Sequence, residues 1–448
     1  MGRRSLLVIC VLGYVLMLHI IYIEVINPEF YYFGYIYIPM SGMQWAFSLT
    51  LTLLGAFLMP VSVSRPSQVV VWLLFLIVVV PCNFVPYYTL GHVDFSIYFF
   101  QIILFFSLFI LTRVSKLPLL RIAGLYIHKK VFWCAVAVIS MGFYAILVYT
   151  FGFRFQITML GDIYELREDY RASVNRIAGY SINWQSKVIN TLLIAYGIAN
   201  KKPGIALIGF IGQLFIFSIT GHKSVLLSIC MIFGFWFALR KSGKNFAFYF
   251  LLSYLGLAVI SFFSAIAGST LAVSLFVRRM IITPGMLSGF YVDFFSSHDR
   301  YHLSHSILGI FNENPYGKTP SFLMGQEYFG KADMAANANV FADAYANFGP
   351  SGVLAFSLLL GGVLWLYDCI ACSKPLIESS LFLSIAAWSL TDTALLTSLL
   401  THGILLTLLV VYCFPKKEVE RIERHHHDQF RPSYYRHSYL RERSRKSG

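Results

Sequence analysis

The chain has 448 residues, of which 57% are apolar and 12% charged, and its formal net charge is +14. A soluble domain carries about 25% charged residues, so this deficit, together with repeated apolar runs of about 18 residues or more, excludes a soluble multidomain enzyme. It predicts an all-α polytopic membrane protein. The positive charge does not indicate nucleic-acid binding, because most basic residues lie in short segments between apolar runs, where they report topology.

Hydropathy divides the chain into a transmembrane domain over 1–414 and a basic tail over 415–448. The first apolar run follows a basic pair but is too long for a cleaved signal peptide, so we expect it to remain as a helix. About twelve transmembrane helices are expected, at 5–25, 45–63, 69–88, 95–111, 131–151, 184–199, 204–219, 225–239, 246–267, 352–372, 376–390 and 398–414.

The distribution of basic residues predicts the orientation. If both termini are cytoplasmic, 24 of the 35 Lys and Arg residues lie in inner segments, as the positive-inside rule requires. Two large loops, at about 152–183 and 271–349, then lie on the outer face. The tail, which contains RHHHD and RERSRK, is expected to lie on anionic headgroups.

Arginine residues gather in the two outer loops, where the topology rule does not explain them. Four precede the span 184–199, and Arg278 and Arg279 follow the span 246–267. Arginine suits bidentate binding of phosphate oxygens, although each side chain could equally contact water or headgroups. In ELREDYRASVNR, Arg167 and Arg171 are four apart and would share a helix face. We favour Arg171, which has fewer close acidic neighbours.

The stretch HDRYHLSH places His298, His302 and His305 where they would share one face of a helix. Three imidazoles on a face can bind zinc, one of them could serve as acid or base, or all three could be polar surface. The Ser-Ser-His-Asp start resembles a helix cap. We therefore predict no metal site.

The stretch NANVFADAYANFG is rich in carboxamides and lies before the span 352–372. On a helix, Asn339, Asp343 and Asn347 would align, and Asn337 precedes them. Carboxamides and carboxylates beside aromatic rings can hydrogen-bond sugar hydroxyls. The alternative is a capped helix start that ends at Gly349-Pro350.

The stretch TGHKS lies between the expected spans 204–219 and 225–239, at the outer tip of a helical hairpin. His222 and Lys223 could contact a substrate there. They could equally form a plain hairpin turn whose Lys reaches the interface.

Five motifs together resemble Wzy-type O-antigen polymerases, which join oligosaccharide repeat units. They are TGHKSVLLS, RRMIITPGMLSGFYVDFF, YHLSHSILG, MGQEYFG and NANVFADAYANFGPSGV, and the resemblance covers about 164–368. It implies a GT-C-like fold in a bacterial inner membrane and transfer of the growing chain from undecaprenyl pyrophosphate to a new lipid-linked repeat unit at the periplasmic face. It also implies membrane lipid as a partner, allows a chain-length regulator protein as a second partner, and implies no cofactor or metal.

Read with this chemistry, the loops supply a candidate site. Asp343 or His305 is expected to orient or deprotonate the acceptor hydroxyl, and Arg171 and Arg279 to bind the pyrophosphate. The remaining candidate substrate-binding residues are Arg167, Arg278, His222, Lys223, Glu327, Asn337, Asn339 and Asn347.

Two other functions remain open from the sequence. The related O-antigen ligase uses the same donor but transfers finished chain to lipid A-core. A flippase or other transporter for lipid-linked oligosaccharides places charges and broken helices near the membrane midplane, and Asp368, Glu378 and Asp392 lie in or beside expected spans.

Overall fold

The computed structural model describes residues 2–125, 127–153, 163–240, 243–306 and 308–415, without the side chains of 163–165 and Phe311. Within these residues all regular secondary structure is helical, and there is no β-strand. The predicted tail from 416 onward and residues 154–162 of the first predicted outer loop lie outside them.

The α-helices, in chain order, are α1 (Arg3–Ile21), α2 (Asn27–Phe30), α3 (Gly42–Leu58), α4 (Pro66–Leu74), α5 (Val80–Thr89), α6 (Phe95–Val114), α7 (Lys129–Phe151), α8 (Ile163–Ser173), α9 (Arg176–Trp184), α10 (Asn190–Ala199), α11 (Pro203–Thr220), α12 (Lys223–Leu239), α13 (Phe246–Ile266), α14 (Thr283–Ser297), α15 (Pro320–Phe329), α16 (Val340–Ala371), α17 (Leu376–Trp388), α18 (Leu395–Leu400) and α19 (Ile404–Cys413). Stretches of π-helix interrupt or extend them at η1 (Tyr22–Ile26), η3 (Phe75–Val79), η4 (Gln185–Ile189) and η6 (Val273–Ile282). Short 3-10 turns are η2 (Tyr31–Phe33), η5 (Gly243–Asn245), η7 (Gly309–Phe311) and η8 (Ser389–Thr391).

Eight helical stretches of the described chain are long and apolar enough to cross a membrane, and each coincides with an expected span. Three more expected spans coincide with shorter apolar helices, Gly42–Leu58, Lys223–Leu239 and Leu376–Thr391. The remaining one, 184–199, lies in the continuous helix of α9, η4 and α10. The all-helical, multi-pass membrane class is therefore confirmed. The count of twelve crossings, the orientation and the GT-C-like fold stay predictions.

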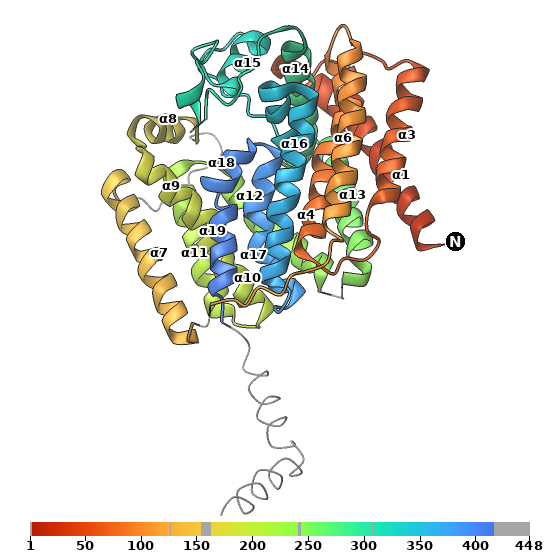
Figure 1. The fold of residues 1–448 in the computed structure, drawn as a ribbon. Coiled ribbons are helices and arrows are strands. Elements are labelled where there is room, and N and C mark those ends of the chain that lie inside the picture. Colours follow the sequence, from red (N-terminus) through yellow and green to blue (C-terminus); the bar gives the residue numbers. More distant parts are fainter. Residues whose placement is uncertain (1, 126, 154–162, 241–242, 307, 416–448) are drawn as a thin grey trace, which may run out of the picture.

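The helices stand side by side, and in the view of Figure 1 α15 lies at the top of the bundle while α8 lies at its upper left, near α9. At the centre is the stretch Pro66–Thr89, whose most apolar window is buried over its full length. In contrast, α7 lies at the edge of the bundle in Figure 1, with only 17% of its window buried.

Part of the segment predicted to form the second outer loop packs into this core. The continuous helix of η6 and α14 lies along α5. A Cβ atom at Gly285 would lie 2.8 Å from the backbone of Pro81, and one at Gly289 would lie 2.9 Å from the Pro86 side chain. Small residues at such contacts let helix backbones approach closely. The backbone of η6, which carries Arg278 and Arg279, is therefore fixed by the buried helix α14 that continues it.

The long helix α16 is broken near its start, as the Gly349-Pro350 pair predicts. Gly349 has φ 64° and ψ −149°, a conformation that is essentially restricted to glycine. The Arg300 guanidinium occupies the space that a Cβ atom at this position would need. The break separates a short first part of the helix, which begins at Val340, from the apolar part that follows.

Replacing Gly349 with Ala is expected to destabilise the protein by at least about 1–3 kcal/mol. An alanine at this position would have to adopt the disfavoured backbone conformation, and its Cβ atom would overlap the Arg300 guanidinium. The measurement is the thermal unfolding midpoint of purified protein in detergent. Gly362→Ala is the matched control in the same helix, because an added Cβ there meets no atom within 4 Å. Equal midpoints for the two variants would contradict this account.

Candidate active site

A cavity of about 540 Å³ is bordered by α8, α9, η4, the turn between α11 and α12, η6, the start of α16 and the break between α17 and α18. It gathers cations, carboxylates, imidazoles, phenols and carboxamides in one space. Its main polar lining residues are Tyr170, Asn183, Lys187, Gln213, His222, Arg279, Tyr291, His305, Asn337, Asp343, Asp392 and His402. The predicted site residues among them are Asp343, His305, Arg279, His222 and Asn337.

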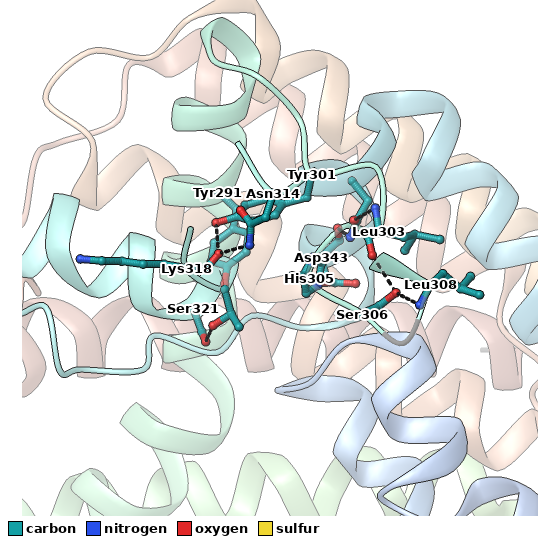
Figure 2. Close-up of polar contacts among 12 residues, drawn as sticks. Tyr291, Tyr301, Leu303, His305, Ser306, Leu308, Asn314, Lys318, Ser321 and Asp343 are labelled. Atoms are coloured by element: carbon teal, nitrogen blue, oxygen red, sulfur yellow. Dashed lines mark hydrogen bonds and ion pairs between the residues drawn. The ribbon is translucent and has the colours of Figure 1, made fainter. Parts of the chain in front are cut away.

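Asp343 and His305 form the pair that the sequence proposed as alternatives. The Nε2 atom of His305 lies 3.7 Å from Oδ1 of Asp343, and their side chains are only 12% and 10% exposed. Figure 2 shows the two side chains together, with Tyr301 beside them. The Tyr301 ring meets the imidazole edge-on at 5.0 Å. Among the described residues, Nδ1 of His305 is buried without a hydrogen-bond partner.

Asn339 places Asp343 by starting the helix that carries it. Its Oδ1 accepts hydrogen bonds from the backbone N–H groups of Phe341 and Ala342, which caps α16. Its amide donates to Ser288 Oγ on α14, at 2.7 Å. Asn339 is thus a buried capping residue and does not line the cavity.

Asn347 joins the two segments that carry the Asp343–His305 pair. Its Oδ1 accepts from the backbone N–H of Leu303 at 2.8 Å, and its amide donates to the carbonyl of Asp343 at 2.9 Å. The loop that Asn347 binds has an unusual backbone. His302 and Leu303 have φ values of 47° and 65°, which residues other than glycine adopt rarely. Asn347 also does not line the cavity.

The three histidines of HDRYHLSH do not share a helix face, because the stretch is a turn in the structure. His298 follows the last residue of α14 and stacks on Phe294 with ring centroids 4.0 Å apart. His302 is exposed and has positive φ. Only His305 reaches the cavity.

The adjacent residues Arg278 and Arg279 have different surroundings. Arg279 lines the cavity with an exposed side chain and, among the described residues, makes no hydrogen bond or ion pair. Arg278 instead lies 4.5 Å over the Phe30 ring and donates to Ser274 Oγ at 2.9 Å. Both belong to the π-helical stretch η6, and π-helical segments frequently occur at functional sites.

Four further predicted site residues do not line the cavity: Arg167, Arg171, Lys223 and Glu327. Arg167 donates through Nε and Nη2 to the carbonyl of Gly221, at 3.1 and 3.0 Å, and so clamps the turn between α11 and α12. Arg171 is exposed and, like Lys223, does not line the cavity. Glu327 is exposed on α15, where it accepts from Gln326.

Sequence reasoning missed Lys187 and His402 and gave Asp392 only to the transport alternative. Lys187 lies on η4, the π-helical stretch between α9 and α10. Asp392 follows η8 where α17 and α18 are separated, and His402 lies between α18 and α19. A usable signal existed, because an ionisable residue inside an apolar span indicates a functional site. Lys187 meets that criterion.

The other two acidic residues named for transport have structural partners. Asp368 accepts from the backbone N–H of Ser67 at 3.0 Å and from its hydroxyl. Glu378 accepts from the Asn200 amide at 3.2 Å. Neither lines the cavity.

Within the described part of the chain, no group of three or more His, Cys, Asp or Glu side chains is arranged to hold a metal ion. The cavity itself places the Asp343–His305 pair beside cations and carboxamides. Comparisons with protein-family models, with curated proteins and with solved structures find no match to this chain.

Proposed function

We propose that the protein is a Wzy-type O-antigen polymerase, a glycosyltransferase that joins undecaprenyl-pyrophosphate-linked oligosaccharide repeat units at the periplasmic face of a bacterial inner membrane. The observation that carries the proposal is the convergence of Asp343, His305 and Arg279 on one cavity, beside apolar helices long enough to cross a membrane. Four of the five motifs that resemble the family border this cavity, at the turn before α12, at η6, at the turn that carries His305 and at the start of α16.

The reaction assigns a role to each of these groups. The acceptor hydroxyl gives its proton to the Asp343–His305 pair, and its oxygen bonds to the anomeric carbon of the donor sugar. The bond from that carbon to the diphosphate oxygen breaks, and its electron pair leaves with the diphosphate. Arg279 stabilises the negative charge that develops there, and its planar fork suits two phosphate oxygens at once.

Carboxamide groups in the same cavity suit the sugar part of the substrates. Asn183, Gln213 and Asn337 line it, and each amide can both donate to and accept from hydroxyl groups. Tyr170 and Tyr291 add ring faces and phenol groups to the wall.

The deciding experiment incubates purified protein in detergent with a lipid-linked repeat unit. A ladder of products that differ by one repeat unit is the expected result. Absence of elongation by correctly folded protein, at substrate concentrations that bind, would refute the proposal. Supplying lipid A-core as a second acceptor separates the ligase, which transfers to that acceptor and makes no ladder.

A transporter for lipid-linked oligosaccharides is the second candidate, because Lys187 and Asp392 lie in one cavity on interrupted helices. Transporters place charges on discontinuous helices in this way. Such a protein moves labelled lipid across a sealed vesicle membrane and leaves the glycan length unchanged. Elongation in detergent therefore distinguishes the two functions directly.

A further inference from the structure

His222 lies in a strongly positive part of the cavity. The charged groups that act on its imidazole are, in decreasing order, Arg167, Arg279, Lys187 and Arg171, and all four are cations. Arg167 and Arg171 come from α8, while Lys187 comes from η4 and Arg279 from η6. No carboxylate is among the groups that act on the imidazole, although Asp392 attracts two of the four cations, Lys187 and Arg279.

The backbone around His222 is fixed at two points, and its imidazole packs against one aromatic ring. His222 precedes α12, and its backbone N–H donates to Thr220 Oγ1 at 3.2 Å. The Tyr170 ring meets the imidazole at right angles, with centroids 5.1 Å apart. Arg167 fixes the preceding carbonyl, that of Gly221. The side chain therefore stays at the cavity wall.

Burial and these four cations lower the pKa of His222 to about 4. The imidazole is thus neutral near pH 7 while the cavity holds no anion. A positive potential that repels a proton also attracts an anion, and a bound anion in turn stabilises the imidazolium form. An anion that binds here is consequently expected to carry a proton with it.

Two cations of the cavity are available to a ligand. Within the described residues, neither Arg279 nor Lys187 makes a hydrogen bond or a direct ion pair, and both are attracted at longer range to Asp392. Asp392 is itself exposed towards the cavity. Lys187 can therefore turn to an incoming anion without breaking a direct ion pair.

We propose that His222, Lys187 and Arg279 form the binding site for the diphosphate of a lipid carrier, and that His222 takes up one proton from solvent when the diphosphate binds. The identity of the ligand rests on the proposed function; the anion site rests on the geometry. The imidazolium and the two side-chain cations then surround the diphosphate, and the proton returns to solvent when the diphosphate leaves. Other titratable groups that line the cavity are Tyr170, Tyr291, His305, Asp343, Asp392 and His402.

The test is isothermal titration calorimetry of the full-length protein in detergent with inorganic pyrophosphate. Titrations at one pH in two buffers of different ionisation enthalpy give the protons taken up on binding. Wild type is expected to take up more protons than His222→Gln, and its affinity to rise more steeply as the pH falls. Protonation of pyrophosphate itself contributes equally to both proteins and cancels in the difference.

Lys187→Ala is expected to bind pyrophosphate about 10-fold to 100-fold more weakly, since it loses one charge-assisted contact. Lys187→Arg, which keeps the charge, should recover much of the affinity. Lys331→Ala is the matched control, because it removes one exposed cation that does not line the cavity. Elution volume and unfolding midpoint establish that each variant is folded.

Farnesyl pyrophosphate identifies the source of the diphosphate. It carries the same group on a prenyl chain and should bind more tightly than inorganic pyrophosphate. Equal or weaker binding would overturn the lipid-carrier assignment. The anion site itself is refuted by absence of pyrophosphate binding, by equal proton uptake in wild type and His222→Gln, or by unchanged affinity in Lys187→Ala. None of these readouts needs glycan elongation, so a failed ladder assay leaves them interpretable.

Discussion

Replacing Asp343 with Asn is expected to lower the rate of glycan elongation by about 10²-fold to 10⁴-fold, the usual contribution of a positioned general base. The side chain keeps its shape and its place on α16, since Asn339 still caps the helix. It loses the negative charge that accepts a proton or stabilises an imidazolium at His305, 3.7 Å away. The measurement is the initial rate of ladder formation from a purified lipid-linked repeat unit.

His305→Gln completes this test. If the two side chains act as one unit, each single variant and the double variant should have similarly low rates, because effects within such a unit are not additive. Asp333→Asn is the matched control, since Asp333 belongs to the same segment but is exposed and does not line the cavity. Near-normal rates in both Asp343→Asn and His305→Gln would show that another group accepts the proton.

Replacing Arg279 with Lys is expected to lower the rate by roughly a hundredfold, equivalent to about 3 kcal/mol, although the charge is kept. A lysine cannot present two parallel N–H donors to two phosphate oxygens. The loss should exceed any structural effect, because the Arg279 side chain is exposed and, among the described residues, makes no hydrogen bond or ion pair. The same initial-rate assay measures it.

Arg176→Lys is the control for this substitution. Arg176 is an exposed arginine at the start of α9 and does not line the cavity. Its rate should equal that of wild type. If Arg279→Lys also keeps nearly the full rate, the leaving diphosphate is stabilised by other groups, and the assignment of Arg279 is wrong.

Hydropathy and charge by themselves determined the helical, membrane-spanning class of this protein. Each expected span coincides with a helix because a stretch of about 20 apolar residues must satisfy its own backbone hydrogen bonds in lipid, whatever packs beside it. Local signals also located the helix over Arg167 and Arg171 and the break at Gly349. These features depend on neighbours within a few residues in the sequence.

The tertiary structure alone decided which polar residues share the cavity. Asn339 and Asn347 lie on the same face as Asp343, yet the side chains of both are hydrogen-bonded within the fold, Asn339 to backbone groups and to Ser288 and Asn347 to backbone groups. Arg278 and Arg279 are adjacent in sequence, but aromatic rings from the N-terminal region hold the first. Lys187 lies on η4, Asp392 follows η8 and His222 precedes α12, so the three come from separate segments of the chain. Their convergence depends on how helices pack across long sequence separations, and periodicity along one chain segment carries no information about that.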